Sequence, residues 1–141
     1  MKYCPTHRTQ LLLEVLNMEE SFVVSFFVDE SSDKETNTYI GSRFIPYINE
    51  LMEKHKNIVF LLPYGYASSK SVARTVRVLT KMHTDVNAHC RMACGNSANG
   101  VYKKMVDMSD MSYLYIEKDS SSMCSIMKYI RESDKKCIKM K

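Results

Sequence analysis

Residues 57–82, NIVFLLPYGYASSKSVARTVRVLTKM, contain the pattern that decides the fold. The first seven residues are a continuous apolar run with the length of a buried strand. Tyr64–Ala67 (YGYA) has the composition of a turn. Apolar side chains then recur at helical spacing on one face, at Val72, Ala73, Val76 and Leu79. The stretch therefore predicts a buried strand, a turn and an amphipathic helix from about Ser68 to Met82.

Similar units precede and follow this stretch. Two more dense apolar runs of strand length, Ser21–Asp29 (SFVVSFFVD) and Met111–Glu117 (MSYLYIE), each lead through a polar segment into residues with helical spacing. A weaker strand is predicted over residues 86–91, followed by a helix at about 98–108 that Ser97 caps, and a short last strand over residues 137–140. Strands that alternate with helices in this way predict an α/β fold, a three-layer Rossmann-like domain with a mostly parallel sheet.

The length of 141 residues fits one domain. We expect residues 21–141 to form this single Rossmann-like α/β domain. Residues 1–20 are expected to be an N-terminal helical extension with an apolar face over residues 11–16, and this uncovered face predicts a homo-oligomer. A composition of 45% hydrophobic and 26% charged residues excludes a disordered chain, and no apolar run reaches the roughly 20 residues of a membrane helix.

The net charge and the cysteines indicate the compartment and the kind of partner. A net charge of +4 is mild and suits small anionic ligands as well as nucleic acid. Five cysteines, odd in number and unevenly spaced, favour reduced thiols over a disulfide framework. No targeting segment is recognised at the start of the sequence. We therefore expect a cytoplasmic protein with no membrane partner.

Three loops and the helix behind the first of them carry the residues expected to bind a ligand. In an open parallel sheet, ligands lie beyond the carboxyl ends of the strands, where the N–H groups of helix N-termini attract anions. A glycine there permits close approach of a phosphate, hydroxyls and arginines bind phosphate, and tyrosine rings stack on a base. The candidates are Tyr64, Gly65, Tyr66, Ser68, Ser69, Arg74, Arg91, Asn96, Asp119, Ser120, Ser121 and Ser122. Ordinary turns and helix caps have the same composition.

Other chemistry has less support in the sequence. No catalytic motif is recognised, and no catalytic residue or cofactor is predicted. Cys90 and Cys94, near His83 and His89, are residue types that bind zinc, but their spacing fits no closed four-ligand site, so buried thiols are expected instead of a metal. One helix carries a basic stripe, Lys70, Arg74, Arg77 and Lys81. Such a stripe suits nucleic acid, although it is more often a solvated helix face.

Residues near the C-terminus carry a family resemblance. Ser109-Asp110, the strand after them, Ser120-Ser121-Ser122 and the amphipathic helix that follows resemble the SLOG superfamily, whose Rossmann-like domains include the DNA-processing Smf proteins and the LOG nucleotide hydrolases. The resemblance extends over residues 58–140, with Gly65 in place of a glycine-rich loop. The sequence lacks the motif of the LOG hydrolases that carries the catalytic Glu. The resemblance therefore implies a degenerate member that binds a nucleotide ligand without hydrolysing it.

Three functional hypotheses follow, and the first is favoured. It is a small cytosolic protein, not an enzyme, that binds a nucleotide derivative as a sensor or sponge of a nucleotide signal, a role expected in viral or host-defence settings. The alternative is a nucleoside or nucleotide N-glycosidase or deoxyribosyltransferase-like enzyme that uses Glu117 or Asp119. The third is a nucleic-acid or protein interaction module that uses the basic stripe.

Overall fold

The computed structural model describes residues 21–28, 40–115 and 121–140, without the side chains of five of them: Ala98, Ser121, Ser122, Met123 and Met140. The described strands are β1 (Phe22–Val28), β2 (Asn57–Pro63), β3 (Asn87–Ala93), β4 (Met111–Tyr115) and β5 (Lys136–Met140). A 3₁₀ helix, η1 (Ile40–Phe44), and four α-helices connect them: α3 (Ile45–Lys54), α4 (Ala67–Met82), α5 (Ala98–Met108) and α6 (Ser121–Glu132). The predicted N-terminal extension, residues 1–20, lies outside the described residues.

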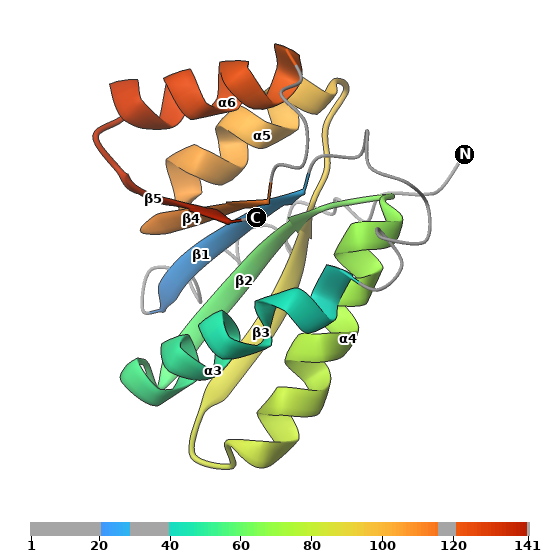
Figure 1. Ribbon diagram of the computed structural model, residues 1–141, viewed down its shortest axis with the longest axis vertical. Coiled ribbons are helices and arrows are strands. Elements are labelled where there is room, and N and C mark those ends of the chain that lie inside the picture. The colour runs from blue at the N-terminus through green and yellow to red at the C-terminus, as the bar shows by residue number, and fades with distance from the viewer. Residues whose placement is uncertain (1–20, 29–39, 116–120, 141) are drawn as a thin grey trace, which may run out of the picture.

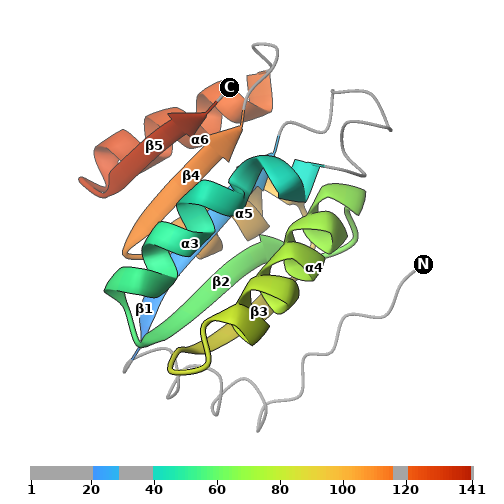
Figure 2. The same ribbon diagram turned by 60° about the horizontal axis from the view of Figure 1, so that its bottom comes forward.

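The five strands form one parallel sheet in the order β3-β2-β1-β4-β5. Helices α3 and α4 cover one face, and α5 and α6 cover the other, so the molecule has three layers (Figure 1). Figure 2 shows α3 and α4 side by side over the same face. The predicted three-layer Rossmann-like fold is therefore confirmed. After β1, the strands β2 and β3 are added on one side of it. The chain then crosses back, and β4 and β5 are added on the other side. The boundary between β1 and β4 is therefore a topological switch point.

The alternation of side chains along β1 supplies both halves of the core. Val24, Phe26 and Val28 are buried on the face covered by α3 and α4, whereas Val23 and Phe27 are buried on the opposite face. Because both faces are covered, the strand reads as an unbroken apolar run.

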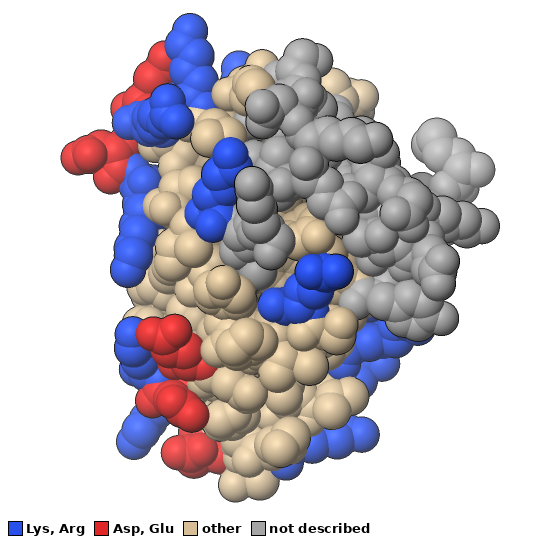
Figure 3. All heavy atoms as spheres, in the orientation of Figure 1, with Lys and Arg blue, Asp and Glu red and all other residues tan. Residues whose placement is uncertain are grey.

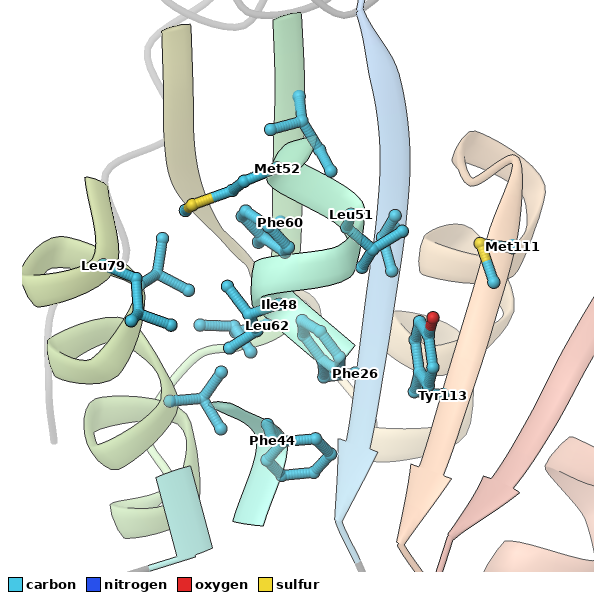
Figure 4. Packing of buried hydrophobic residues seen from close by; sticks show 14 of the residues in the cluster. Phe26, Phe44, Ile48, Leu51, Met52, Phe60, Leu62, Leu79, Met111 and Tyr113 are labelled. Atoms are coloured by element: carbon cyan, nitrogen blue, oxygen red, sulfur yellow. The ribbon is translucent and has the colours of Figure 1, made fainter. Parts of the chain in front are cut away.

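The core under α3 and α4 is centred on Phe26, whose ring contacts three others. The ring centroids lie 5.0 Å from Phe44, 5.6 Å from Phe60 and 5.3 Å from Tyr113 (Figure 4). On the other face, Phe27 packs edge-on against Tyr102 of α5 at 5.3 Å. Burial of large side chains on both faces stabilises a chain of this size as a single unit.

Several element boundaries differ from those expected by one or two residues, and β1 (Phe22–Val28) and β5 (Lys136–Met140) are among them. Helix α4 begins at Ala67 and has Tyr66 as its N-cap, so Ser68 lies inside the first turn. Strand β3 covers Asn87–Ala93, two residues beyond the predicted end. Helix α5 and its cap are as predicted, because Ser97 Oγ accepts a 3.1 Å hydrogen bond from the amide of Gly100. No helix in the described ranges is long and apolar enough to cross a membrane.

Candidate functional site

The carboxyl edge of the sheet brings together two of the three predicted ligand loops. The β2–α4 loop, Tyr64–Tyr66, follows one strand, and the β3–α5 loop, residues 94–97, follows its neighbour. The amide of Tyr64 donates a 2.9 Å hydrogen bond to the carbonyl of Ala93, which joins the two loops directly. Helices α4 and α5 both begin at this edge, so their first N–H groups are directed to it.

The third predicted loop is only partly described. Asp119 and Ser120 lie outside the described residues, as does Glu117, the candidate of the enzymatic alternative. Ser121 and Ser122 form the first turn of α6, and only their backbone is described. The strands that precede these undescribed segments, β1 and β4, are the two that flank the switch point.

Gly65 occupies a position that requires glycine. Its φ of +97° lies in the left-handed region that side chains disfavour. A Cβ atom at this position would find no described atom within 4 Å, so the space beside the backbone is open. Tyr64 and Tyr66 flank it and are both partly exposed. The loop therefore offers an open backbone between two accessible rings.

The two serines that follow this loop are turned into the protein. Ser68 is 2% and Ser69 is 3% exposed. Ser69 Oγ donates a 2.6 Å hydrogen bond to the carbonyl of Pro63, the last residue of β2. Their burial favours a structural role, because it leaves little of either side chain accessible to a ligand.

The β3–α5 loop has its own constraints. Gly95 lies so close to the first turn of α5 that a Cβ atom there would stand 2.8 Å from Val101 Cγ2. Asn96 is exposed at the tip of the loop. Arg91 lies two residues before the end of β3 and is partly exposed, and its Nη1 donates a 3.2 Å hydrogen bond to the carbonyl of Cys90. Asn96 and Arg91 are thus the predicted site residues that belong to β3 and its loop.

Arg74 does not belong to this edge. It lies seven residues after the start of α4, about 10 Å along the helix axis. It is exposed together with the other three members of the basic stripe, Lys70, Arg77 and Lys81. The stripe therefore faces solvent, as its spacing predicted, but it is separate from the predicted ligand loops.

A groove that sequence reasoning missed runs between α4 and the sheet edge at β3. Its volume is about 350 Å³, and it is lined by Ala73, Val76, Arg77, Thr80, Lys81, Ala88, His89 and Cys90. Burial raises the pKa of the Cys90 thiol to about 12, while the positive charges of Arg77 and Arg91 act in the opposite direction. The thiol is therefore protonated at neutral pH and is a poor nucleophile.

The cysteines and histidines form no metal site within the described part of the chain. No group of three or more His, Cys, Asp or Glu side chains there is arranged to hold an ion. Cys90, Cys124 and Cys137 are free thiols. Cys94 is disulfide-bonded, which corrects the expectation that all thiols are reduced.

The Ser109-Asp110 pair carries part of the family resemblance. It lies at the amino ends of the strands, opposite to the predicted ligand loops. It precedes β4, so it stands where the strands begin. Ser109 Oγ donates a 2.5 Å hydrogen bond to the carbonyl of Met105 and also contacts Ser25 Oγ, and both serines are buried. The contacts of this pair are thus internal to the fold.

No family model matches the chain, and neither a curated protein nor a solved structure is significantly similar to it.

Proposed function

We propose that this protein binds a nucleotide-derived ligand at the carboxyl edge of its sheet. The hydrogen bond between the Tyr64 amide and the Ala93 carbonyl carries this proposal, because it joins the loops in front of α4 and α5 into one surface. Ligands of open α/β sheets bind at this edge, and anionic groups are attracted to helix N-termini.

Each group in this surface suits one part of a nucleotide. The open backbone at Gly65 leaves room for a phosphate near the first N–H groups of α4. The rings of Tyr64 and Tyr66 suit stacking on a base. In this proposal, Asn96 and Arg91 bond the phosphate or the sugar from the β3 side. The resemblance to SLOG domains supports the nucleotide class of ligand and adds the loop at residues 119–122 to the same site.

The composition of the two described loops favours binding over catalysis. Residues 63–69 and 93–97 contain no Asp, Glu or His, the side chains that most often act as acid or base. We therefore propose a sensor or sponge of a nucleotide signal in the cytoplasm. The enzymatic alternative depends on Glu117 or Asp119. Incubation with a nucleotide panel tests it, because a released base would support hydrolysis or transfer.

Thermal stabilisation by nucleotides tests the binding proposal. We expect at least one member of a panel of mono-, di- and cyclic nucleotides to raise the Tm of the wild-type protein. Gly65→Asp and Gly65→Asn introduce the same backbone strain and nearly the same volume, so they differ mainly in charge. Gly65→Asp should abolish the rise in Tm, whereas Gly65→Asn should keep most of it. An equal response of the two variants would contradict a phosphate at this loop.

We also propose that the protein forms a homo-oligomer through the apolar face predicted over residues 11–16. This segment lies outside the described residues, so the sequence alone supports the proposal. Light scattering at high protein concentration distinguishes a monomer from a dimer or larger assembly, and a monomer would overturn it.

A further inference from the structure

The basic residues of this chain are concentrated in one part of the sequence. Residues 54–106 contain nine Lys and Arg residues and a single acidic residue, Asp85, whereas the remainder contains eleven Lys and Arg against fifteen Asp and Glu. Residues 54–106 supply β2, α4, β3 and most of α5, which include the sheet edge at β3. The modest net charge therefore conceals a strongly basic segment of the sequence.

The exposed face of α4 carries the most regular part of this charge. Lys70, Arg74, Arg77 and Lys81 are all exposed. They cover eleven residues of one helix, about 16 Å. Helix α4 itself contains no Asp or Glu, whereas Lys54 of α3 is paired with Glu50. Nothing in the described part of the chain neutralises Arg74, Arg77 or Lys81.

Figure 3 shows how the charges lie on one face of the protein. The lower right of this face, where α4 lies in Figure 1, carries blue basic atoms and no red acidic ones, whereas on the opposite side acidic and basic atoms are mixed. The groove beside β3 extends this basic surface inward. Arg77 and Lys81 line it from α4, and His89 lines it from β3. The stripe thus lies beside a hollow of about 350 Å³ that two of its own members, Arg77 and Lys81, help to line.

The spacing of the stripe suits the backbone of a duplex. One strand of B-DNA carries a phosphate for about every 3.4 Å of axis, so a 16 Å row of cations parallels about five phosphates. The exposed apolar side chains of α4, Val78 and Met82, are aliphatic and provide no ring on which an unpaired base could stack. We propose that the face formed by Lys70, Arg74, Arg77 and Lys81 docks on the phosphate backbone of double-stranded nucleic acid without reading its sequence.

An acidic peptide is the competing partner, and the structure makes it less suitable. A peptide strand would add to the edge of the sheet at β3 and would contact the groove residues Arg77 and Lys81. It would leave Lys70 and Arg74, on the outer face of α4, without a role. A duplex engages all four members of the stripe.

Fluorescence anisotropy with a labelled 20-base-pair DNA duplex at 50 to 300 mM salt tests this inference. Four phosphate contacts predict that log K falls with log salt with a slope of about −3.6. The double variant Arg74→Glu/Arg77→Glu should weaken binding at least tenfold at the lowest salt and reduce the slope by about 2. Two lysines on α6 and β5, Lys128 and Lys139, are also exposed. Their double change to Glu alters the net charge by the same amount and should change affinity less than twofold.

Three results would overturn the inference. One is the absence of wild-type binding at 50 mM salt, and another is an equal loss in the two double variants, which would indicate net charge alone. The third is displacement of the duplex by polyglutamate at an equal concentration of charge, which would indicate an acidic protein partner. Arg74→Ala/Arg77→Ala, with a Tm near that of the wild type, excludes unfolding as the cause of a loss. The same Arg74→Ala/Arg77→Ala variant should keep the nucleotide-induced rise in Tm, which separates this surface from the nucleotide site.

Discussion

Asp110 is bonded to the backbone of Val23 by both its main chain and its side chain. The Val23 amide donates a 2.7 Å hydrogen bond to Asp110 Oδ2, and the Asp110 amide donates a 2.7 Å hydrogen bond to the Val23 carbonyl. The two residues are 87 positions apart in the sequence. Their contact ties the turn between α5 and β4 to the start of β1, next to the paired residues Val24 and Met111. It therefore fixes the alignment of the two strands that flank the switch point.

Replacement of this carboxylate should lower the stability of the sheet. Hydrogen bonds to charged groups contribute about 1.5–3 kcal/mol, and Asp110 is exposed, so we expect Asp110→Ala to lower the free energy of unfolding by about 1.5 kcal/mol. Asp110→Asn keeps an acceptor oxygen and should lose less than half as much. Urea denaturation of the three proteins measures the difference. If Asp110→Ala and Asp110→Asn lower the free energy of unfolding equally, the amide oxygen of Asn does not restore the hydrogen bond from the Val23 amide.

Gly41 should tolerate no larger residue, because η1 lies directly against α4 at this point. The Gly41 amide donates a 2.9 Å hydrogen bond to Ser71 Oγ, and a Cβ atom at Gly41 would overlap with the Ser71 carbonyl oxygen and Thr75 Oγ1. One overlapping group is backbone and cannot turn away. We expect Gly41→Ala to lower the free energy of unfolding by about 3 kcal/mol, at the upper end of the range for overpacking.

Gly100 provides the matched control for this substitution. It lies in α5, where alanine is favoured over glycine by up to about 1 kcal/mol. Among the described atoms, a Cβ atom there would meet the hydroxyl of Ser97, at 3.0 Å, and no backbone atom. Gly100→Ala should therefore leave the Tm unchanged or raise it. A similar fall in Tm for both variants would contradict the close contact of Gly41 with α4.

The protein should lose stability in alkaline solution because two groups are protonated more strongly in the folded state. Burial raises the pKa of the Cys90 thiol to about 12, and burial and then the charge of Glu50 raise that of the Tyr113 hydroxyl to about 12. Their unfolded values are about 8.5 and 10. Between these values and 12, the folded state binds more protons than the unfolded state, so the free energy of unfolding falls as pH rises.

Urea denaturation at pH 8 and pH 11 measures this loss. Each group contributes at most about 1.4 kcal/mol per pH unit within its own window. Cys90→Ala and Tyr113→Phe should each reduce the fall between the two pH values, even where they lower stability at pH 8. Cys124→Ala, which removes an exposed thiol, should not change the fall. If the free energy of unfolding falls equally in the wild type and in all three variants, other titrating groups cause the fall.

The central strands could be predicted from the sequence, but the edge strand could be predicted only in part. Strands β1, β2 and β4 have a neighbour on each side and helices on both faces, so their apolar runs are continuous. Strand β3 lies at the edge, and most of its side chains are only partly buried, which leaves no clear period between 87 and 93. The strand order depends on long-range pairings such as Val24 with Met111, and no local pattern records them.

The sequence predicted which loops lie together, but not which of their side chains are accessible. Ligands of parallel sheets bind where a strand leads into a helix, and this rule selected the loops at Gly65 and Asn96. The two loops do lie together. The rule could not distinguish a serine that faces a ligand from one that faces the core, because the two have the same composition. Ser69 is directed to the carbonyl of Pro63, and Ser71 receives the amide of Gly41. The groove beside β3 was missed because it pairs Arg77 of a helix with His89 of a strand.

Tyr66 is the residue at which stability and ligand binding should be separable. It is the N-cap of α4, with φ −99° and ψ 145°, yet its side chain accepts no hydrogen bond from the helix. Asparagine suits this conformation and would accept a bond from the second or third amide of the helix. We expect Tyr66→Asn to raise the free energy of unfolding by about 1 kcal/mol. The same change removes a ring that the proposed function places against a base.

Tyr66→Phe is the matched variant, because it keeps the ring and supplies no cap. It should leave the Tm of the free protein and the nucleotide-induced rise in Tm close to those of the wild type. Tyr66→Asn should raise the first and reduce the second. Such opposite changes in one protein cannot come from general destabilisation, so they would support a stacking role at the N-cap. A nucleotide-induced rise that is undiminished in Tyr66→Asn would remove Tyr66 from the proposed site and leave Tyr64 as the ring that stacks on the base.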